Sequence, residues 1–146
     1  MDIIPYEERY RDDLIFMVLQ AKDALGRIPR LSEDLLDIRA HYTDRGDVFF
    51  LAVEDGRVVG CAGCSGVLGG GEVFLHRLYV KASMKRRGIG SALLGAVEDW
   101  LRGRGVRSLH VHLGSPPEQW YESRAFYPKH GFREYAPCYM VKDLGG

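Results

Sequence analysis

The stretch KRRGIGSALL, residues 85–94, decides the fold of this chain. It follows a strand-like run that ends at Val80, and it opens a segment with apolar residues at helical spacing. The backbone N–H groups in the first turn of a helix have no partner inside the helix, and the helix dipole adds partial positive charge there. Gly88 and Gly90 allow an anionic group to come close to this backbone. A strand, a glycine-containing loop and a helix in this order therefore predict a phosphate-binding site.

Hydrophobic periodicity around this stretch predicts alternating strands and helices. The expected strands cover residues 3–6, 48–53, 57–64, 72–80 and 108–113, with two short strands near the C-terminus. The expected helices cover residues 7–24, a segment that begins at Ser32, residues 89–101 and residues 118–127. The order β-α-α-β-β-β-α-β-α-β-β implies a mixed α/β fold, in which helices cover both faces of a central sheet.

Two short signals predict where elements begin or turn. Ser32 has the side chain of an N-cap, and the acidic residues after it suit the first turn of a helix. Asp55 and Gly56 lie between two apolar runs and predict a tight hairpin turn.

Length and composition restrict the class of protein. The chain has 146 residues, 46% of them hydrophobic and 27% charged, which predicts a single domain over residues 1–146. The formal net charge is zero, so neither a nucleic acid nor a membrane is an expected partner. The N-terminus lacks the basic and apolar regions of a signal peptide, which predicts a cytoplasmic location. Exposed sheet edges would allow a homodimer, but no residue decides it.

The cysteines and histidines do not predict a metal site. Cys61 and Cys64 lie three residues apart in an expected strand, so their side chains should point to opposite faces of the sheet. His110 and His112 share one face of another strand, but no third ligand accompanies them. We therefore expect structural thiols and no metal cofactor.

The glycine loop also differs from the common nucleotide-binding motifs. It lacks the Gly-Lys-Ser/Thr ending of a P-loop and the third glycine of a dinucleotide-binding fingerprint. It resembles the pattern Gln/Arg-x-x-Gly-x-Gly/Ala of the GNAT family of N-acetyltransferases, with Lys85 in the first position. A second stretch, Tyr-Pro-Lys-His-Gly-Phe at residues 127–132, resembles the family's Tyr-x-x-x-Gly-Phe. The two motifs occur in the family's order, and the resemblance spans most of the chain.

The resemblance implies a binding site for acetyl-CoA. The amides of residues 86–91 would bind the pyrophosphate of coenzyme A. The backbone of residues 78–80 would pair with its pantetheine arm, and an amide there would stabilise charge on the thioester oxygen. The expected cofactor-binding residues are Leu78, Tyr79, Val80, Lys85, Arg86, Arg87, Gly88, Ile89, Gly90 and Ser91.

The resemblance also implies direct transfer of an acetyl group to a primary amine, either on a small molecule or on a peptide. Tyr127 would give a proton to the departing thiolate. Glu72 or His76, which share the parity of the expected strand 72–80, would take a proton from the amine, provided that no β-bulge reverses that parity. His112 is a third candidate for this base.

Two residues depart from the family pattern. Pro128 disfavours helical geometry at Tyr127, and Trp120 stands where many relatives have an asparagine that contacts the cofactor. They leave open a second hypothesis, a non-catalytic acyl-CoA-binding module of the same fold. The acceptor is not decided, because Arg27 and Arg30 would suit an acidic one, whereas Asp34 and Glu72 would suit a cationic one.

Overall fold

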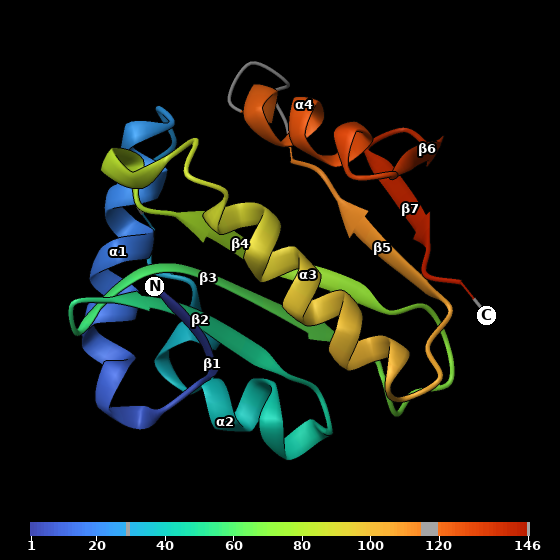
Figure 1. The fold of residues 1–146 in the computed structure, drawn as a ribbon, viewed down its shortest axis with the longest axis horizontal. Coiled ribbons are helices and arrows are strands. Elements are labelled where there is room, and N and C mark those ends of the chain that lie inside the picture. Colours follow the sequence, from blue (N-terminus) through green and yellow to red (C-terminus); the bar gives the residue numbers. More distant parts are fainter. Residues whose placement is uncertain (29, 115–119, 146) are drawn as a thin grey trace.

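A computed structural model describes residues 1–28, 30–114 and 120–145 (Figure 1). Its strands are β1 (Asp2–Pro5), β2 (Phe49–Glu54), β3 (Arg57–Ser65), β4 (Phe74–Val80), β5 (Ser108–His112), β6 (Arg133–Ala136) and β7 (Tyr139–Asp143). Its α-helices are α1 (Arg11–Ala24), α2 (Ile38–His41), α3 (Ile89–Arg102) and α4 (Tyr121–Lys129). Short 3-10 helices lie at η1 (Glu8–Tyr10), η2 (Glu33–Leu36), η3 (Thr43–Arg45) and η4 (Ala82–Met84).

The seven strands form one mixed sheet in the order β1-β2-β3-β4-β5-β7-β6. Among these described strands, β4 and β5 pair in parallel, while the other neighbouring strands are antiparallel. The parallel pair is joined through α3, as expected for a β-α-β unit. The predicted order of strands and helices and the mixed α/β class are both confirmed.

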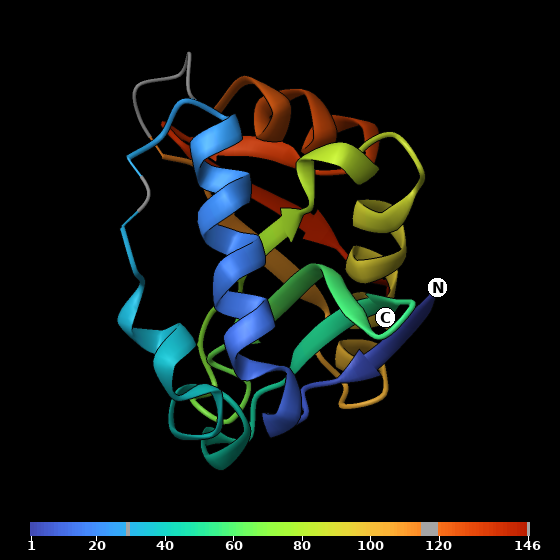
Figure 2. The same cartoon turned by 90° about the vertical axis from the view of Figure 1, so that its left-hand side faces the viewer.

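Helices cover both faces of the sheet. Figure 1 shows α3 across one face, and Figure 2 shows α1 in front of the other. Leu93, Val97 and Leu101 of α3 belong to one buried apolar cluster, whereas Leu14 and Met17 of α1 belong to a second. These apolar stripes are what hold the helices to the sheet.

The two cysteines of β3 confirm the strand prediction. Cys61 belongs to the cluster under α1 and Cys64 to the cluster under α3, so the two thiols point to opposite faces. Burial raises the pKa of the Cys61 thiol to about 12 and that of Cys64 to about 11. Both are therefore protonated packing residues at neutral pH. The hairpin turn is also confirmed, because Asp55 and Gly56 both have positive φ.

Several predicted boundaries are wrong because contacts with other parts of the chain override the local sequence signal. Ser32 makes no N-cap hydrogen bond but accepts one from Lys22 Nζ at 2.9 Å, and Asp37 caps α2 instead. β4 begins at Phe74, not at Glu72. Phe74 pairs with Ser65, the last residue of β3, so the residues before Phe74 have no partner in β3. The beginning of the helix expected at residues 118–127 lies partly outside the described residues.

In the described part of the chain, no helix is long and apolar enough to cross a membrane.

Candidate active site

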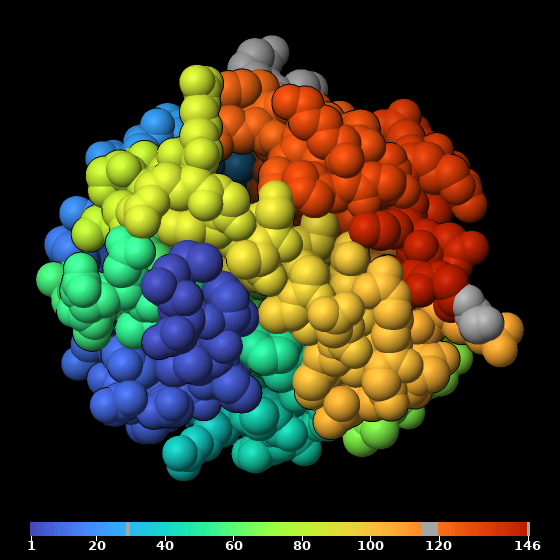
Figure 3. All heavy atoms as spheres, in the orientation of Figure 1, coloured from blue at the N-terminus to red at the C-terminus, as the bar shows by residue number. Residues whose placement is uncertain are grey.

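The parallel strands β4 and β5 separate almost as soon as they meet. Phe74 pairs with His110, and the His110 amide donates to the Val73 carbonyl at 2.8 Å. Beyond this pair the two strands diverge, and a cavity of about 630 Å³ opens between them, under α4 and beside the start of α3. Figure 3 shows the corresponding hollow between the yellow-green loop before α3 and the orange α4.

A β-bulge in β4 sets the direction of the side chains that follow it on this wall of the cavity. Between the paired positions His76 and Tyr79, β4 advances three residues while β3 advances two. Arg77 lies in the bulge with a φ of 57°, a left-handed conformation that is rare outside glycine. Leu78 and Val80 consequently pack toward the cluster under α3, while Tyr79 joins the cluster under α1. Since the bulge follows His76, it does not turn that side chain away.

The side chain of Arg77 anchors the bulge to the segment after α1. Its Nε and Nη2 donate to the two carboxylate oxygens of Asp34, each at 3.0 Å. The Tyr42 hydroxyl donates to the same carboxylate at 2.6 Å. Burial alone would raise the pKa of Asp34, but these hydrogen bonds outweigh it and hold the pKa below its ordinary value. A charged pair therefore connects the bulge to η2.

The predicted phosphate loop forms one end of the cavity. Gly88 is the N-cap of α3 with a φ of 79°, and open space surrounds the position that a Cβ would take, so the backbone is what requires glycine here. Lys85 forms an ion pair with Glu122 of α4, across the mouth of the cavity. Arg87 turns away and pairs with Glu54, with a nearest distance of 3.0 Å. Every predicted cofactor-binding residue except Arg87 lines the cavity.

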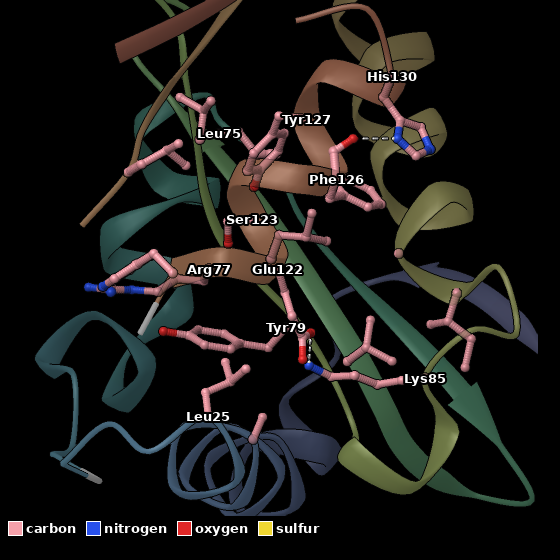
Figure 4. Close-up of a pocket in the computed structure, with 18 of the residues that line it drawn as sticks. Leu25, Leu75, Arg77, Tyr79, Lys85, Glu122, Ser123, Phe126, Tyr127 and His130 are labelled. Atoms are coloured by element: carbon pink, nitrogen blue, oxygen red, sulfur yellow. Dashed lines mark hydrogen bonds and ion pairs between the residues drawn. The ribbon is translucent and has the colours of Figure 1, made fainter. Parts of the chain in front are cut away.

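Tyr127 lies in the wall of this cavity, on α4. Its side chain is buried, and burial, with the neighbouring Tyr79, raises the pKa of its hydroxyl above the ordinary value. The phenol is therefore protonated at neutral pH. The expectation that Pro128 disturbs the helix at Tyr127 is wrong, since α4 continues through both residues to Lys129. Figure 4 shows the Tyr127 ring between Leu75 and Ser123.

The two candidate bases lie in different places. His76 lines the cavity, and its Nε2 is 2.7 Å from Ser65 Oγ. The surrounding protein and the positive charge of Arg77 lower the pKa of His76, so its imidazole is neutral at pH 7. Glu72 is exposed, precedes β4 and is not among the lining residues. The prediction that Glu72 shares a strand face with His76 is wrong, because the strand starts after Glu72.

The other histidines do not form a metal site. His112 lines the cavity and its ring lies 4.6 Å from that of Tyr139, while His110 Nδ1 is 3.0 Å from the Tyr135 hydroxyl. Across residues 1–28, 30–114 and 120–145, no three His, Cys, Asp or Glu side chains are grouped so that they could hold a metal ion.

Two cavity contacts escaped the sequence analysis. The guanidinium of Arg27 lies 3.6 Å above the Trp120 ring, which joins the end of α1 to the start of α4. Ser91 Oγ is 2.8 Å from His130 Nε2, which joins α3 to the end of α4. Each contact joins residues far apart in the chain, so neither leaves a local sequence pattern. His130 was detectable only as part of the motif around Tyr127.

Comparisons with known proteins agree with this geometry. A model of the acetyltransferase (GNAT) family matches residues 15–132. A GNAT-family acetyltransferase from Staphylococcus aureus Mu50 superimposes with a TM-score of 0.84 at 21% identity, over 99% of each chain. The PaiA N-acetyltransferase from Thermoplasma acidophilum, solved with coenzyme A, superimposes with a TM-score of 0.71 at 20% identity, over 98% of this chain and 99% of that one.

A third solved structure is the ribosomal-protein-S18-alanine N-acetyltransferase from Escherichia coli. Its TM-score is 0.77 at 21% identity, over 99% of this chain and 94% of that one. A search of curated proteins finds no match. At these identities the structures establish a common fold, while the family match extends over most of the sequence. The chain therefore belongs to the GNAT family of acetyltransferases.

Proposed function

We propose that the protein is an acetyl-CoA-dependent N-acetyltransferase, which moves an acetyl group to a primary amine by direct attack in a ternary complex. The observation that carries this proposal is that one cavity is lined by the glycine loop, the diverging backbone of β4 and Tyr127. In the proposal, the glycine loop binds the phosphates of the cofactor, the backbone of β4 binds the thioester, and Tyr127 protonates the leaving thiolate. The proposal needs no covalent enzyme intermediate.

At the loop end, the first-turn amides of α3 and the helix dipole would hold the pyrophosphate. The pantetheine arm would then run between β4 and β5, where β4 has lost its parallel partner beyond Phe74. A backbone amide after the bulge would donate to the thioester oxygen as negative charge develops on it. We assign Leu78, Tyr79 and Val80 to this segment through their backbone alone.

The chemical step needs two proton transfers. The amine nitrogen attacks the thioester carbonyl carbon, an N–C bond forms, and the C–S bond breaks. His76, neutral at pH 7, takes a proton from the amine directly or through water. Tyr127, protonated at neutral pH, gives a proton to the departing sulfur. The products are an acetamide and the free thiol of coenzyme A.

Calorimetric titration with acetyl-CoA tests the cofactor site, with ATP as the control ligand. Gly88→Asp and Gly88→Asn form a matched pair, since both side chains tolerate the left-handed conformation at this position but only aspartate adds negative charge. We expect Gly88→Asp to weaken acetyl-CoA binding about a hundredfold more than Gly88→Asn, roughly 2.8 kcal/mol.

Each outcome of this titration has a distinct meaning. If acetyl-CoA does not bind to the wild-type protein, or if ATP binds instead, the proposal is wrong. If acetyl-CoA binds but no amine in a broad panel is acetylated, the result favours the non-catalytic acyl-CoA-binding module. If Gly88→Asn and Gly88→Asp bind equally well, the phosphates do not lie against the start of α3.

A further inference from the structure

The end of the cavity opposite the glycine loop carries positive charge. Arg27 and Arg77 both line the cavity. In Figure 4 the side chains of Arg77 and Tyr79 extend toward this end, away from Lys85, and the positive charge of Arg27 acts on the same Tyr79. Among the lining residues that the structure describes, the single carboxylate is that of Glu122, which belongs to the loop end and pairs with Lys85.

The two carboxylates that the sequence suggested for a cationic acceptor, those of Asp34 and Glu72, do not face the cavity. Asp34 is not a lining residue, and its two oxygens already accept hydrogen bonds from Arg77 and Tyr42. Glu72 is exposed outside the cavity. Arg77, by contrast, uses Nε and Nη2 for Asp34, and its Nη1 donates to no group in the part of the chain that the structure describes.

A buried ammonium strengthens the positive field behind this wall. Lys22 is 9% exposed, and its Nζ donates to the Arg30 carbonyl at 3.0 Å and to Ser32 Oγ at 2.9 Å. Both partners are neutral, so they satisfy the ammonium without cancelling its charge. Lys22 and Arg77 together outnumber the one carboxylate beside them, Asp34. Burial and the charge of Arg77 lower the pKa of Lys22, as expected where cations gather.

We infer that the amine acceptor also carries a carboxylate, which binds beside Arg27 and Nη1 of Arg77. This inference rests on the proposed function and names the substrate class of the same site. A guanidinium binds a carboxylate through charge-assisted hydrogen bonds, and two of them on one wall fit that group better than an ammonium. Polycationic amines are disfavoured at this wall by repulsion. The same positive field favours the neutral form of the attacking amine, which is the reactive form.

Matched product analogues test this inference. N-acetylglycine and N-acetylglycinamide differ only in the carboxylate, and neither has a free amine whose protonation would complicate the comparison. Their binding is measured by NMR titration, both with the free protein and with the protein saturated with coenzyme A. We expect the carboxylate analogue to bind about tenfold more tightly, and the difference to shrink as ionic strength rises.

Two variants test whether Arg27 causes the preference for the carboxylate analogue. Arg27→Gln should reduce the preference to about twofold, because it removes one lining guanidinium. Arg30→Gln is the matched control, since Arg30 is exposed and does not line the cavity, and it should keep the full preference. The inference is overturned if the two analogues bind equally, if the amide binds more tightly, if neither binds, or if Arg30→Gln acts like Arg27→Gln.

The experiment separates this inference from the proposed function. If coenzyme A binds and polyamines are acetylated faster than amino acids, only the acceptor class is wrong. If coenzyme A does not bind, the proposed function fails, and the free protein still reports whether this wall prefers a carboxylate.

Discussion

The two ends of the cavity are built in different ways. The loop end comes from a continuous run, residues 85–91, and the proposal assigns its binding of phosphate to backbone amides at the start of α3. The opposite end is assembled from side chains that lie far apart in the sequence, such as Arg27 on Trp120 and Arg77 on Asp34. The first is a local structure, and the second exists only when the sheet and helices have packed.

This difference determines how each end should respond to mutation. A backbone site tolerates changes of side chain but not changes of backbone conformation. Replacing Gly88 should therefore weaken acetyl-CoA binding more than replacing the neighbouring cations. A site of converging side chains loses its function when one group is removed, even if the fold is intact. Between the two ends, the acid and base of the proposed reaction belong to the second kind of site.

The largest effect on turnover should come from Tyr127→Phe. This change removes the proposed proton donor to the thiolate but keeps the ring that packs against Phe126 and Phe132. We expect kcat to fall about a hundredfold, while the dissociation constant of acetyl-CoA stays within about twofold. Steady-state kinetics and calorimetry on the same preparation measure both quantities.

Tyr121→Phe is the control for that variant. It is the same substitution on the same helix, but Tyr121 is 61% exposed and does not line the cavity. Full turnover in Tyr127→Phe, or an equal loss in Tyr121→Phe, would show that Tyr127 is not the acid.

A smaller effect, about tenfold in kcat/KM, is expected from His76→Gln. The pKa of His76 is lowered below its ordinary value of 6.5, so the imidazole is neutral at pH 7 and gains a proton only as the pH falls. The wild-type kcat/KM should therefore fall with decreasing pH on the acid side of neutrality, and His76→Gln should lack this fall. A pH profile of both proteins measures it.

Two further variants complete this test. His41→Gln, on α2 and away from the lining residues, should retain the wild-type profile. Glu72→Gln examines the second candidate base, which lies outside the cavity, and we expect little change in its pH profile. If Glu72→Gln abolishes the acid limb while His76→Gln keeps it, the base is Glu72.

The sequence could predict the features whose causes are local. The order of elements, the hairpin at Asp55 and Gly56, and the loop before α3 follow from periodicity and glycine positions, and the structure confirms them. The sequence places the start of β4 two residues too early. The strand starts at Phe74 because β3 offers no partner to the residues before it, and the sequence of β4 alone does not show this.

The bulge at Arg77 and the charged pair that anchors it could not be predicted. Arginine gives no local sign of a positive φ, and its partner Asp34 lies 43 residues away in the chain. The same holds for Ser32, which resembles an N-cap but instead holds the buried ammonium of Lys22. In each case a tertiary contact overrides the local preference of the residue.

The smallest expected effect distinguishes the two cations of the loop. Arg87 is held by Glu54 and points away from the cavity, so Arg87→Gln should change acetyl-CoA affinity less than twofold. Lys85 lines the cavity, but Glu122 partly neutralises its charge through their ion pair. Lys85→Gln should therefore weaken acetyl-CoA binding by about two- to fivefold. Calorimetry at low and moderate ionic strength measures both, and screening should reduce the Lys85 effect. A loss near a hundredfold in Arg87→Gln would mean that side chains, rather than amides, bind the phosphates, and the loop end would then resemble the opposite end in its construction.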